Sequence, residues 1–309
     1  MSKVAIVGDT HFSPRTPVSR KDDYPETLLN KLNSLFKYCV DNKISDCVFL
    51  GDLINANQMN MEYFIKLFKV FLTFFNNNIS LHTIIGNHDI QHGNQEFLEK
   101  SPITLLLDSN LISNEDFIRD NVRFKLVNYY TPLTLIEATY PGMFNVLVGH
   151  LFYLNGFNDT QHTLTPELCK QLGYDIYFLG HDHTPYDPLN VNGYQVHRPG
   201  SFSRATSDTC QVNRDTIQFC VFDTTTHKVD YVDLPGVLPS KDIYKESKLL
   251  SKLNESNNDI TLSEEIDELI DNLTFDFSSD IYKVVDEMEL SEEIRNKVIE
   301  YLESEGMFR

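Results

Sequence analysis

Five short motifs in this sequence join glycine to aspartate, asparagine or histidine, which are residue types that bind metal ions. In chain order they are GDTH at 8–11, GD at 51–52, GNHD at 86–89, GH at 149–150 and GHDH at 180–183. Their mixture of carboxylate, amide and imidazole groups favours a first-row transition metal such as manganese, iron or zinc over magnesium or calcium. One such dipeptide carries no information, but five in one chain predict a metal centre.

The spacing within two motifs suggests how ligands pair. Asp9 and His11 are two residues apart, as are His181 and His183, so on an extended backbone both members of a pair point to one side and can bind one metal. Asp52 is a lone carboxylate, which suits it to bridging two cations.

Two more side chains complete the candidate ligand set. Asn87 offers a neutral amide oxygen and His150 another imidazole. Two metal ions about 3.5–4 Å apart clamp the attacking and leaving oxygens of an in-line displacement at phosphorus, and they lower the pKa of a bridging water. The seven residues therefore predict a dinuclear site that hydrolyses phosphate esters.

The elements that must position these residues can be recognised by their hydrophobic pattern. Continuous apolar runs, typical of strands buried on both faces, precede the five motifs at 4–7, 47–50, 81–85, 146–148 and 176–179. Further β structure is expected at 195–197 and 216–222. Because α/β sheets bind ligands at the carboxyl ends of their strands, the motifs are expected to meet at one edge.

Helices are expected between the strands. Apolar residues recur with the i, i+3, i+4, i+7 spacing of an amphipathic helix over 25–42 and again over 62–75. This alternation of strand and helix predicts an α/β fold with parallel strand pairing.

The composition limits the class of protein. With 309 residues, 41% of them hydrophobic, the chain is long enough for a large domain with a smaller appendage. No stretch approaches the roughly 18–20 apolar residues of a membrane span, and the N-terminus has no signal-peptide core. The five cysteines form no CxxC pair, so a reducing, cytoplasmic location without a membrane partner is expected.

Charge is unevenly distributed along the chain. The net charge of −19 argues against a non-specific nucleic-acid binder. Residues 236–309 hold 19 acidic and 8 basic residues, and a capping-box pattern at 261–264 opens one of two expected helices, at 261–272 and 290–304. We therefore expect a catalytic domain at 1–236 and an acidic, mainly helical region at 237–309 that could bind a partner or simply be solvated.

The order of the five motifs resembles that of the calcineurin-like metallophosphoesterase superfamily over residues 4–235. The resemblance implies a two-sheet β-sandwich flanked by helices. It implies that metal one is held by Asp9, His11, Asp52 and His183, and metal two by Asp52, Asn87, His150 and His181.

The resemblance also implies roles for the two residues that follow Asn87. His88 would face the phosphate, where it would stabilise the transition state or protonate the leaving oxygen. Asp89 would orient His88 from behind.

Two segments outside the motifs resemble a narrower group within this superfamily. RKDDY at 20–24 and RPGS at 198–201 followed by Arg204 are similar to segments of SbcD-like nuclease subunits of DNA recombination and repair complexes, including those of large bacteriophages. That similarity implies double-stranded DNA ends as substrate, Mn2+ as the metal and a coiled-coil SbcC-like ATPase as partner. Six cations are candidates for lining the cleft: Arg15, Arg20, Lys21, Arg198, Arg204 and Arg214.

Alternatives remain open from the sequence. Many nucleases of this group have histidine where this chain has Asn55, which leaves the balance of exonuclease and endonuclease action open. A stand-alone phosphatase or phosphodiesterase acting on nucleotides or phosphoproteins is a second reading, and an inactive scaffold is a third. A homodimer is a further open alternative.

Overall fold

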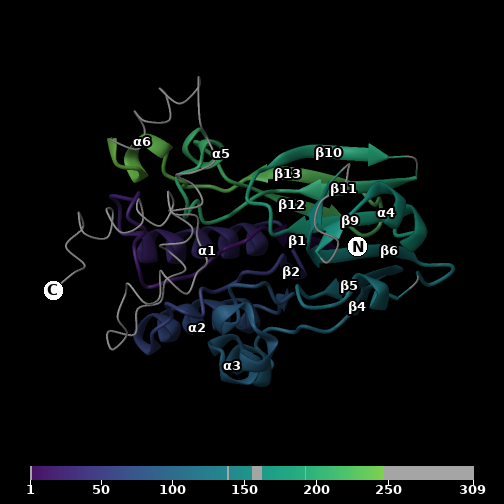
Figure 1. Cartoon of the computed structure of the whole chain (residues 1–309), viewed down its shortest axis with the longest axis horizontal. Helices are drawn as coiled ribbons and strands as arrows, with labels where there is room; N and C mark the ends of the chain where they lie inside the picture. Colours follow the sequence, from purple (N-terminus) through teal and green to yellow (C-terminus); the bar gives the residue numbers. More distant parts are fainter. Residues whose placement is uncertain (1, 138, 155–161, 192, 247–309) are drawn as a thin grey trace, which may run out of the picture.

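The computed structural model describes residues 2–137, 139–154, 162–191 and 193–246 (Figure 1). In this part of the chain two β-sheets lie face to face, with helices on their outer surfaces. This confirms the expected α/β fold built on a two-sheet sandwich. The helices expected at 261–272 and 290–304 lie outside the described residues.

The first sheet has five strands in the order β13-β12-β1-β2-β3. Its parallel half consists of β1 (Lys3–Val7), β2 (Asp46–Phe49) and β3 (Ser80–Thr83), and the antiparallel half of β12 (Gln218–Asp223) and β13 (Val229–Asp233). The parallel pairing expected from the strand–helix alternation is confirmed for β1 to β3.

The second sheet has six strands in the order β10-β11-β9-β6-β5-β4. The four central strands, β5, β6, β9 and β11, pair in parallel, and each edge strand pairs antiparallel. Their bounds are β4 Phe117–Arg119, β5 Val122–Val127, β6 Phe144–His150, β9 Ile176–Gly180, β10 Tyr186–Val191 and β11 Tyr194–Arg198.

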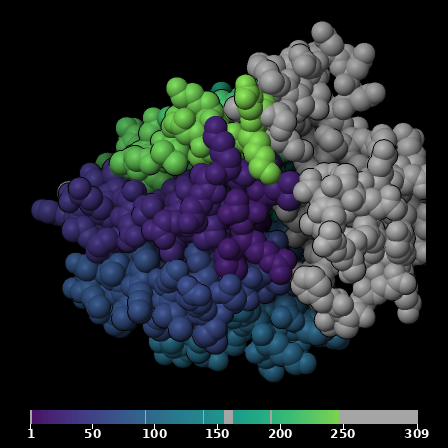
Figure 2. Space-filling view, turned by 90° about the vertical axis from the view of Figure 1, so that its left-hand side faces the viewer, coloured from purple at the N-terminus to yellow at the C-terminus, as the bar shows by residue number. Residues whose placement is uncertain are grey.

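Helices cover the outer faces of both sheets. α1 (Tyr24–Asp41) and α2 (Met61–Asn76) lie side by side over the first sheet (Figures 1 and 2), and they match the two helices expected from the sequence. Each begins at a side chain that caps it, Asp23 for α1 and Asn60 for α2.

The remaining elements are short. α4 (Pro166–Leu172) covers the second sheet, and β7 (Phe152–Tyr153) pairs with β8 (Thr163–Leu164). The others are α3 Pro102–Asp108, α5 Thr209–Val212, α6 Ser240–Ile243 and the 3-10 helices η1 Gln91–Gly93, η2 Gln95–Lys100 and η3 Leu133–Leu135. No helix in the described ranges is long and apolar enough to cross a bilayer.

Two apolar layers explain why β1 is apolar from Val4 to Val7. Along β1, Val4 and Ile6 pack into the core between the sheets, whereas Ala5 and Val7 pack against the helices. Side chains of a strand alternate between its faces, so a strand that packs on both sides is mainly apolar.

The segment after β13 packs back on the domain. Tyr244 is fully buried and forms a β-bridge with Arg20, beside the start of α1. The boundary proposed near residue 236 stays a prediction, since most of the region beyond it is not described.

The α2 helix allows a direct test of this packing. Phe71 is fully buried and contacts Phe12 and Phe49 edge to face, whereas Phe75, one turn later, is 56% exposed. Phe71→Ala should lower the free energy of unfolding by about 3–5 kcal/mol, because it removes apolar contacts and leaves a cavity. Phe75→Ala should change it by less than about 0.5 kcal/mol.

Urea unfolding of both variants followed by circular dichroism is the measurement. Equal losses of stability in the two variants would contradict the assignment of α2's buried and exposed faces.

Candidate metal centre

The five motifs meet at one end of the sandwich, where parallel strands of both sheets finish. The first sheet contributes the residues that follow β1, β2 and β3, and the second contributes the end of β6 and the loop after β9. Ligand candidates far apart in sequence therefore come together without any one segment supplying them all.

One group of candidate ligands consists of Asp9, His11, Asp52 and His183, with one ligand atom from each lying within 4.8 Å of the others. The Nε2 atoms of His11 and His183 are 2.9 Å apart. His183 Nε2 lies 3.5 Å from Asp9 Oδ2, and His11 Nε2 lies 3.8 Å from Asp52 Oδ2. Two imidazoles and two carboxylates thus surround one point.

A second group consists of Asp52, His150 and His181, so Asp52 belongs to both groups. His150 Nε2 lies 3.2 Å from Asp52 Oδ2 and 3.1 Å from Asn87 Oδ1. The sequence-predicted ligands are therefore all brought together, and Asp52 stands between the two groups as expected of a bridge.

The two histidines of the last motif face different groups. His183 belongs with Asp9 and His11, whereas His181 belongs with His150. The expectation that both point to one side of an extended backbone is wrong, because His181 has φ +79° and the chain turns there. One motif thereby supplies a candidate ligand to each of the two groups.

Backbone conformation at the site is unusual. His11, Asp52 and His181 all have positive φ, at +44°, +46° and +79°. Such conformations cost roughly 1–3 kcal/mol each in a residue with a side chain and persist only where the surroundings hold them. Here the His11 and Thr10 amides both donate to Asp52 O, at 2.8 and 3.2 Å.

Glycine is required where the loops approach one another. A Cβ on Gly180 would lie 2.2 Å from Leu50 O and 2.6 Å from Asp9 Oδ1, and one on Gly86 would lie 2.1 Å from Asp52 Oδ1. No side chain fits at those separations, so the glycines before these ligands let the backbones close around the site.

The donor set fits cations. His150 Nδ1 lies 2.8 Å from Leu50 O, which places a proton on Nδ1, so in its neutral, metal-binding form the ring directs the Nε2 lone pair toward the Asn87 and Asp52 oxygens. Asp9 Oδ1 is buried and finds no hydrogen-bond partner among the described residues. Converging lone pairs and a buried, unpartnered carboxylate oxygen are satisfied by a divalent metal ion.

Burial and neighbouring charges shift the pKa values of the groups at the site. Burial raises the pKa of Asp9 to about 6, against the opposing effect of His150 and His183. Burial would lower the pKa of His150, but the adjacent Asp52 outweighs it and raises the pKa to about 9. Burial lowers the pKa of His11 well below its usual value, which favours its neutral, ligating form.

His88 and Asp89 occupy different positions. His88 N donates to Asp52 Oδ1 at 2.8 Å, and the His88 ring lies edge to face with His11, 4.9 Å between centroids. Within the described chain, the fully buried Asp89 carboxylate accepts the Ile54 and Gly86 amides, both at 2.8 Å, rather than a His88 ring nitrogen. Asp89 therefore fixes the loops around His88.

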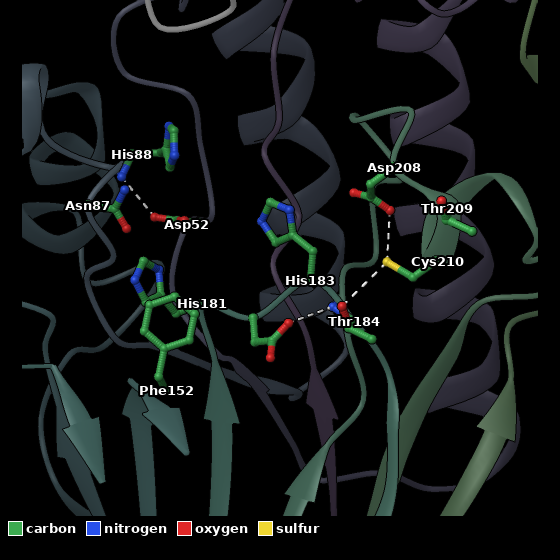
Figure 3. Close-up of a pocket in the computed structure, with 11 residues that line it drawn as sticks. Asp52, Asn87, His88, Phe152, His181, His183, Thr184, Asp208, Thr209 and Cys210 are labelled. Atoms are coloured by element: carbon green, nitrogen blue, oxygen red, sulfur yellow. Dashed lines mark hydrogen bonds between the residues drawn. The ribbon is translucent and has the colours of Figure 1, made fainter. Parts of the chain in front are cut away.

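A pocket of about 460 Å³ opens beside these residues (Figure 3). It is lined by Asp52, Asn87, His88, His181 and His183. It is also lined by residues that the sequence did not predict: Phe152, Asp182, Thr184, Asp208, Thr209 and Cys210. Phe152 could have been suspected from the sequence, because it stands two residues after His150. The 208–210 segment could not, because only a contact between distant parts of the chain brings it to the pocket.

Another residue outside the motifs also lies near the centre. The His162 ring stacks on Tyr129, 3.9 Å between centroids, and Tyr129 lies edge to face with His181. From sequence alone His162 carried no sign of this position.

None of the six candidate cations belongs to the described residues that line the pocket. Arg20 and Arg204 are at most 2% exposed, and Arg20 Nη1 donates to Arg204 O at 2.7 Å. Arg198 is also buried and stacks on Tyr186, 3.6 Å from the ring centroid.

Basic side chains stabilise a turn at 201–204. Its carbonyls accept hydrogen bonds from Lys31, Arg20 and Arg214, while the Phe202 and Ser203 amides donate to Asp9 O, at 2.9 and 3.3 Å. The basic residues thus act on the backbone of a candidate ligand rather than on a substrate.

Known proteins resemble this chain in sequence and in fold. The chain is 23% identical to exonuclease subunit 1 of Enterobacteria phage T4 over 315 residues, covering 96% of this chain and 86% of that protein. A dimetal phosphatase from Danio rerio superposes with a TM-score of 0.51 at 12% identity, covering 75% of this chain and 95% of that one.

The family model for calcineurin-like phosphoesterases matches residues 2–185, which hold all five motifs and more than half of the chain. The protein belongs to the calcineurin-like phosphoesterase family and is a metal-dependent phosphoesterase.

Proposed function

We propose that this protein is a dinuclear phosphodiesterase that cleaves DNA, as the nuclease subunit of a recombination or repair complex. The observation that carries the proposal is the pair of ligand groups sharing Asp52 beside His88. The relation to a phage exonuclease subunit along 96% of the chain favours DNA as the substrate.

We assign Asp9, His11, Asp52 and His183 to the first metal, and Asp52, Asn87, His150 and His181 to the second. Two bound divalent ions, Mn2+ by preference, would lower the pKa of a water between them and neutralise charge on the phosphate. The Leu50 carbonyl fixes the His150 tautomer, and the Asp9 carboxylate is oriented by the His181 amide at 2.9 Å.

His88 is the residue that we assign to the phosphate itself. The His88 amide donates to Asp52, and the Gly86 amide, two residues earlier, donates to Asp89. These hydrogen bonds fix the loop that places the His88 ring at the pocket wall. From there it donates a proton to the leaving oxygen or a hydrogen bond to the developing negative charge. Asp89 acts as a positioning residue for that loop.

The electrostatics of the pocket support a diester substrate. A phosphodiester carries one negative charge, whereas a phosphomonoester carries about two at neutral pH. The described pocket residues include Asp182 and Asp208 but neither lysine nor arginine, so the walls offer no side-chain cation for a second charge.

Affinity for long DNA must then come largely from elsewhere, since it depends on Lys and Arg contacts to phosphates. We propose that a coiled-coil SbcC-like ATPase supplies it, and that residues 237–309 form the region that binds this partner. A homodimer and a cytoplasmic site of action are part of the same proposal.

The shared position of Asp52 gives the first prediction for the site. Asp52→Asn should weaken both metal sites together, because one oxygen of the bridge loses its charge. Isothermal titration with Mn2+ should find two ions per chain in the wild type, and at least tenfold weaker binding of both in the variant.

Asp230→Asn is the matched control, since Asp230 is an exposed carboxylate on β13 that forms an ion pair with Lys228 and belongs to neither ligand group. Normal binding of two Mn2+ by Asp52→Asn would refute the bridging assignment.

His88→Ala should separate metal binding from turnover. The variant should keep two Mn2+ per chain, because His88 belongs to neither ligand group. Its kcat should fall by about 10²–10⁴-fold, the usual contribution of a general acid. A variant with two metals and near-normal kcat would show that the role belongs to another residue.

The substrate class is tested by comparing DNA with small esters. Labelled linear and circular duplexes should be degraded with Mn2+, faster when a candidate ATPase is added, and bis(4-nitrophenyl) phosphate should be preferred to 4-nitrophenyl phosphate. Strong hydrolysis of the monoester without degradation of DNA ends would instead favour the stand-alone phosphatase.

A further inference from the structure

The pocket beside the metal centre has two unlike walls (Figure 3). Phe152 stands at one end next to His181, whereas Thr184, Asp208 and Cys210 lie at the other end beyond His183. In this view His181 and His183 lie between them. A phosphodiester whose phosphate sits at the ligands therefore extends one substituent toward each wall.

The polar wall is engaged in its own hydrogen bonds. Asp208 accepts the Gln211 amide at 2.8 Å and the Cys210 thiol at 2.8 Å, and Asp182 accepts the Thr184 amide at 3.0 Å. Two carboxylates at this end repel further phosphate, and no described pocket residue is a cation that would offset them. Binding of a nucleotide here must draw on its uncharged parts.

The aromatic wall is rigidly placed. Phe152 is the first residue of β7, and its amide donates to His162 O at 2.9 Å. It follows His150 by two residues, and its ring centroid lies 4.1 Å from that of His181 at an interplanar angle of 52°. The ring is thus fixed beside the second ligand group and lines the cavity.

We propose that Phe152 is a stacking platform for a nucleobase of the substrate, on the His181 side of the cleaved phosphate. This inference rests on the proposed phosphodiesterase function and adds a subsite to it. Every base has an apolar π face, and stacking on an aromatic side chain tolerates any sequence, which suits a nuclease without base preference. The cavity of about 460 Å³ accommodates one base beside the ligands.

The test compares two diesters that share a leaving group and differ only in the base. The first is 4-nitrophenyl thymidine phosphate, with the thymidine joined through its 5′ or its 3′ oxygen, and the second is the matching 4-nitrophenyl ester of 1,2-dideoxyribose phosphate, which lacks the base. Release of 4-nitrophenol by the full-length protein with Mn2+ gives kcat/KM for each. The readout is their ratio, which is the preference for a base.

Phe152→Ala should reduce this preference about tenfold for at least one thymidine isomer, within the range of base–aromatic stacking. Phe152→Trp should retain it, because it keeps a π face. Phe152→Leu should lose most of it, because it keeps apolar volume without that face. The ester without the base, measured with each variant, reports whether the active site is still formed.

Two results would overturn the inference while leaving the proposed function intact. One is an unchanged base preference in Phe152→Ala for both isomers. The other is a wild-type protein that hydrolyses both diesters with no preference for the base. Failure of the wild-type protein to hydrolyse any diester would count against the proposed function itself.

Discussion

Burial of the Asp52 carboxylate is the constraint on which the rest of the site depends. The side chain is 1% exposed, and burial by itself would raise its pKa. His150, His88 and His11 outweigh burial and hold that pKa well below the usual value, so the carboxylate remains charged. A charge inside a protein is tolerated only with partners on every side. Parallel strands of two sheets supply those partners, because their carboxyl ends finish around this one group.

The surrounding structure keeps that arrangement in place at a cost in backbone conformation and buried charge. Three site residues adopt left-handed φ angles, and the Arg20 and Lys31 side chains are buried against carbonyls of the 201–204 turn. The amides of the same turn hold the Asp9 carbonyl. Burial lowers the pKa of Lys31 well below its usual value, which shows how much desolvation this support requires. Arg20, a candidate for lining the cleft in the sequence, thus serves to fix a ligand.

The sequence predicted what short-range patterns encode. The seven candidate ligands, the helices α1 and α2 and the parallel strands were all visible, because their spacing and periodicity are local. β5 was missed because Arg123 and Lys125 interrupt its apolar run, and both side chains form ion pairs with Asp116 and Glu137. The opposite directions of His181 and His183 depend on one backbone turn, and the 208–210 wall depends on a distant loop. Neither is written in a local pattern.

The negative net charge of the chain has different consequences for catalysis at the pocket and for affinity for long DNA. At the pocket the charge that matters is local: two ligand groups attract cations, and those cations attract the phosphate, so nearby carboxylates do not exclude a monoanionic diester. They would disfavour a second negative charge, which supports the proposed preference for diesters over monoesters. A base stacked on Phe152 adds binding energy that is independent of charge. A net charge of −19 is therefore compatible with a DNA substrate, provided that contacts to distant phosphates are made by another subunit.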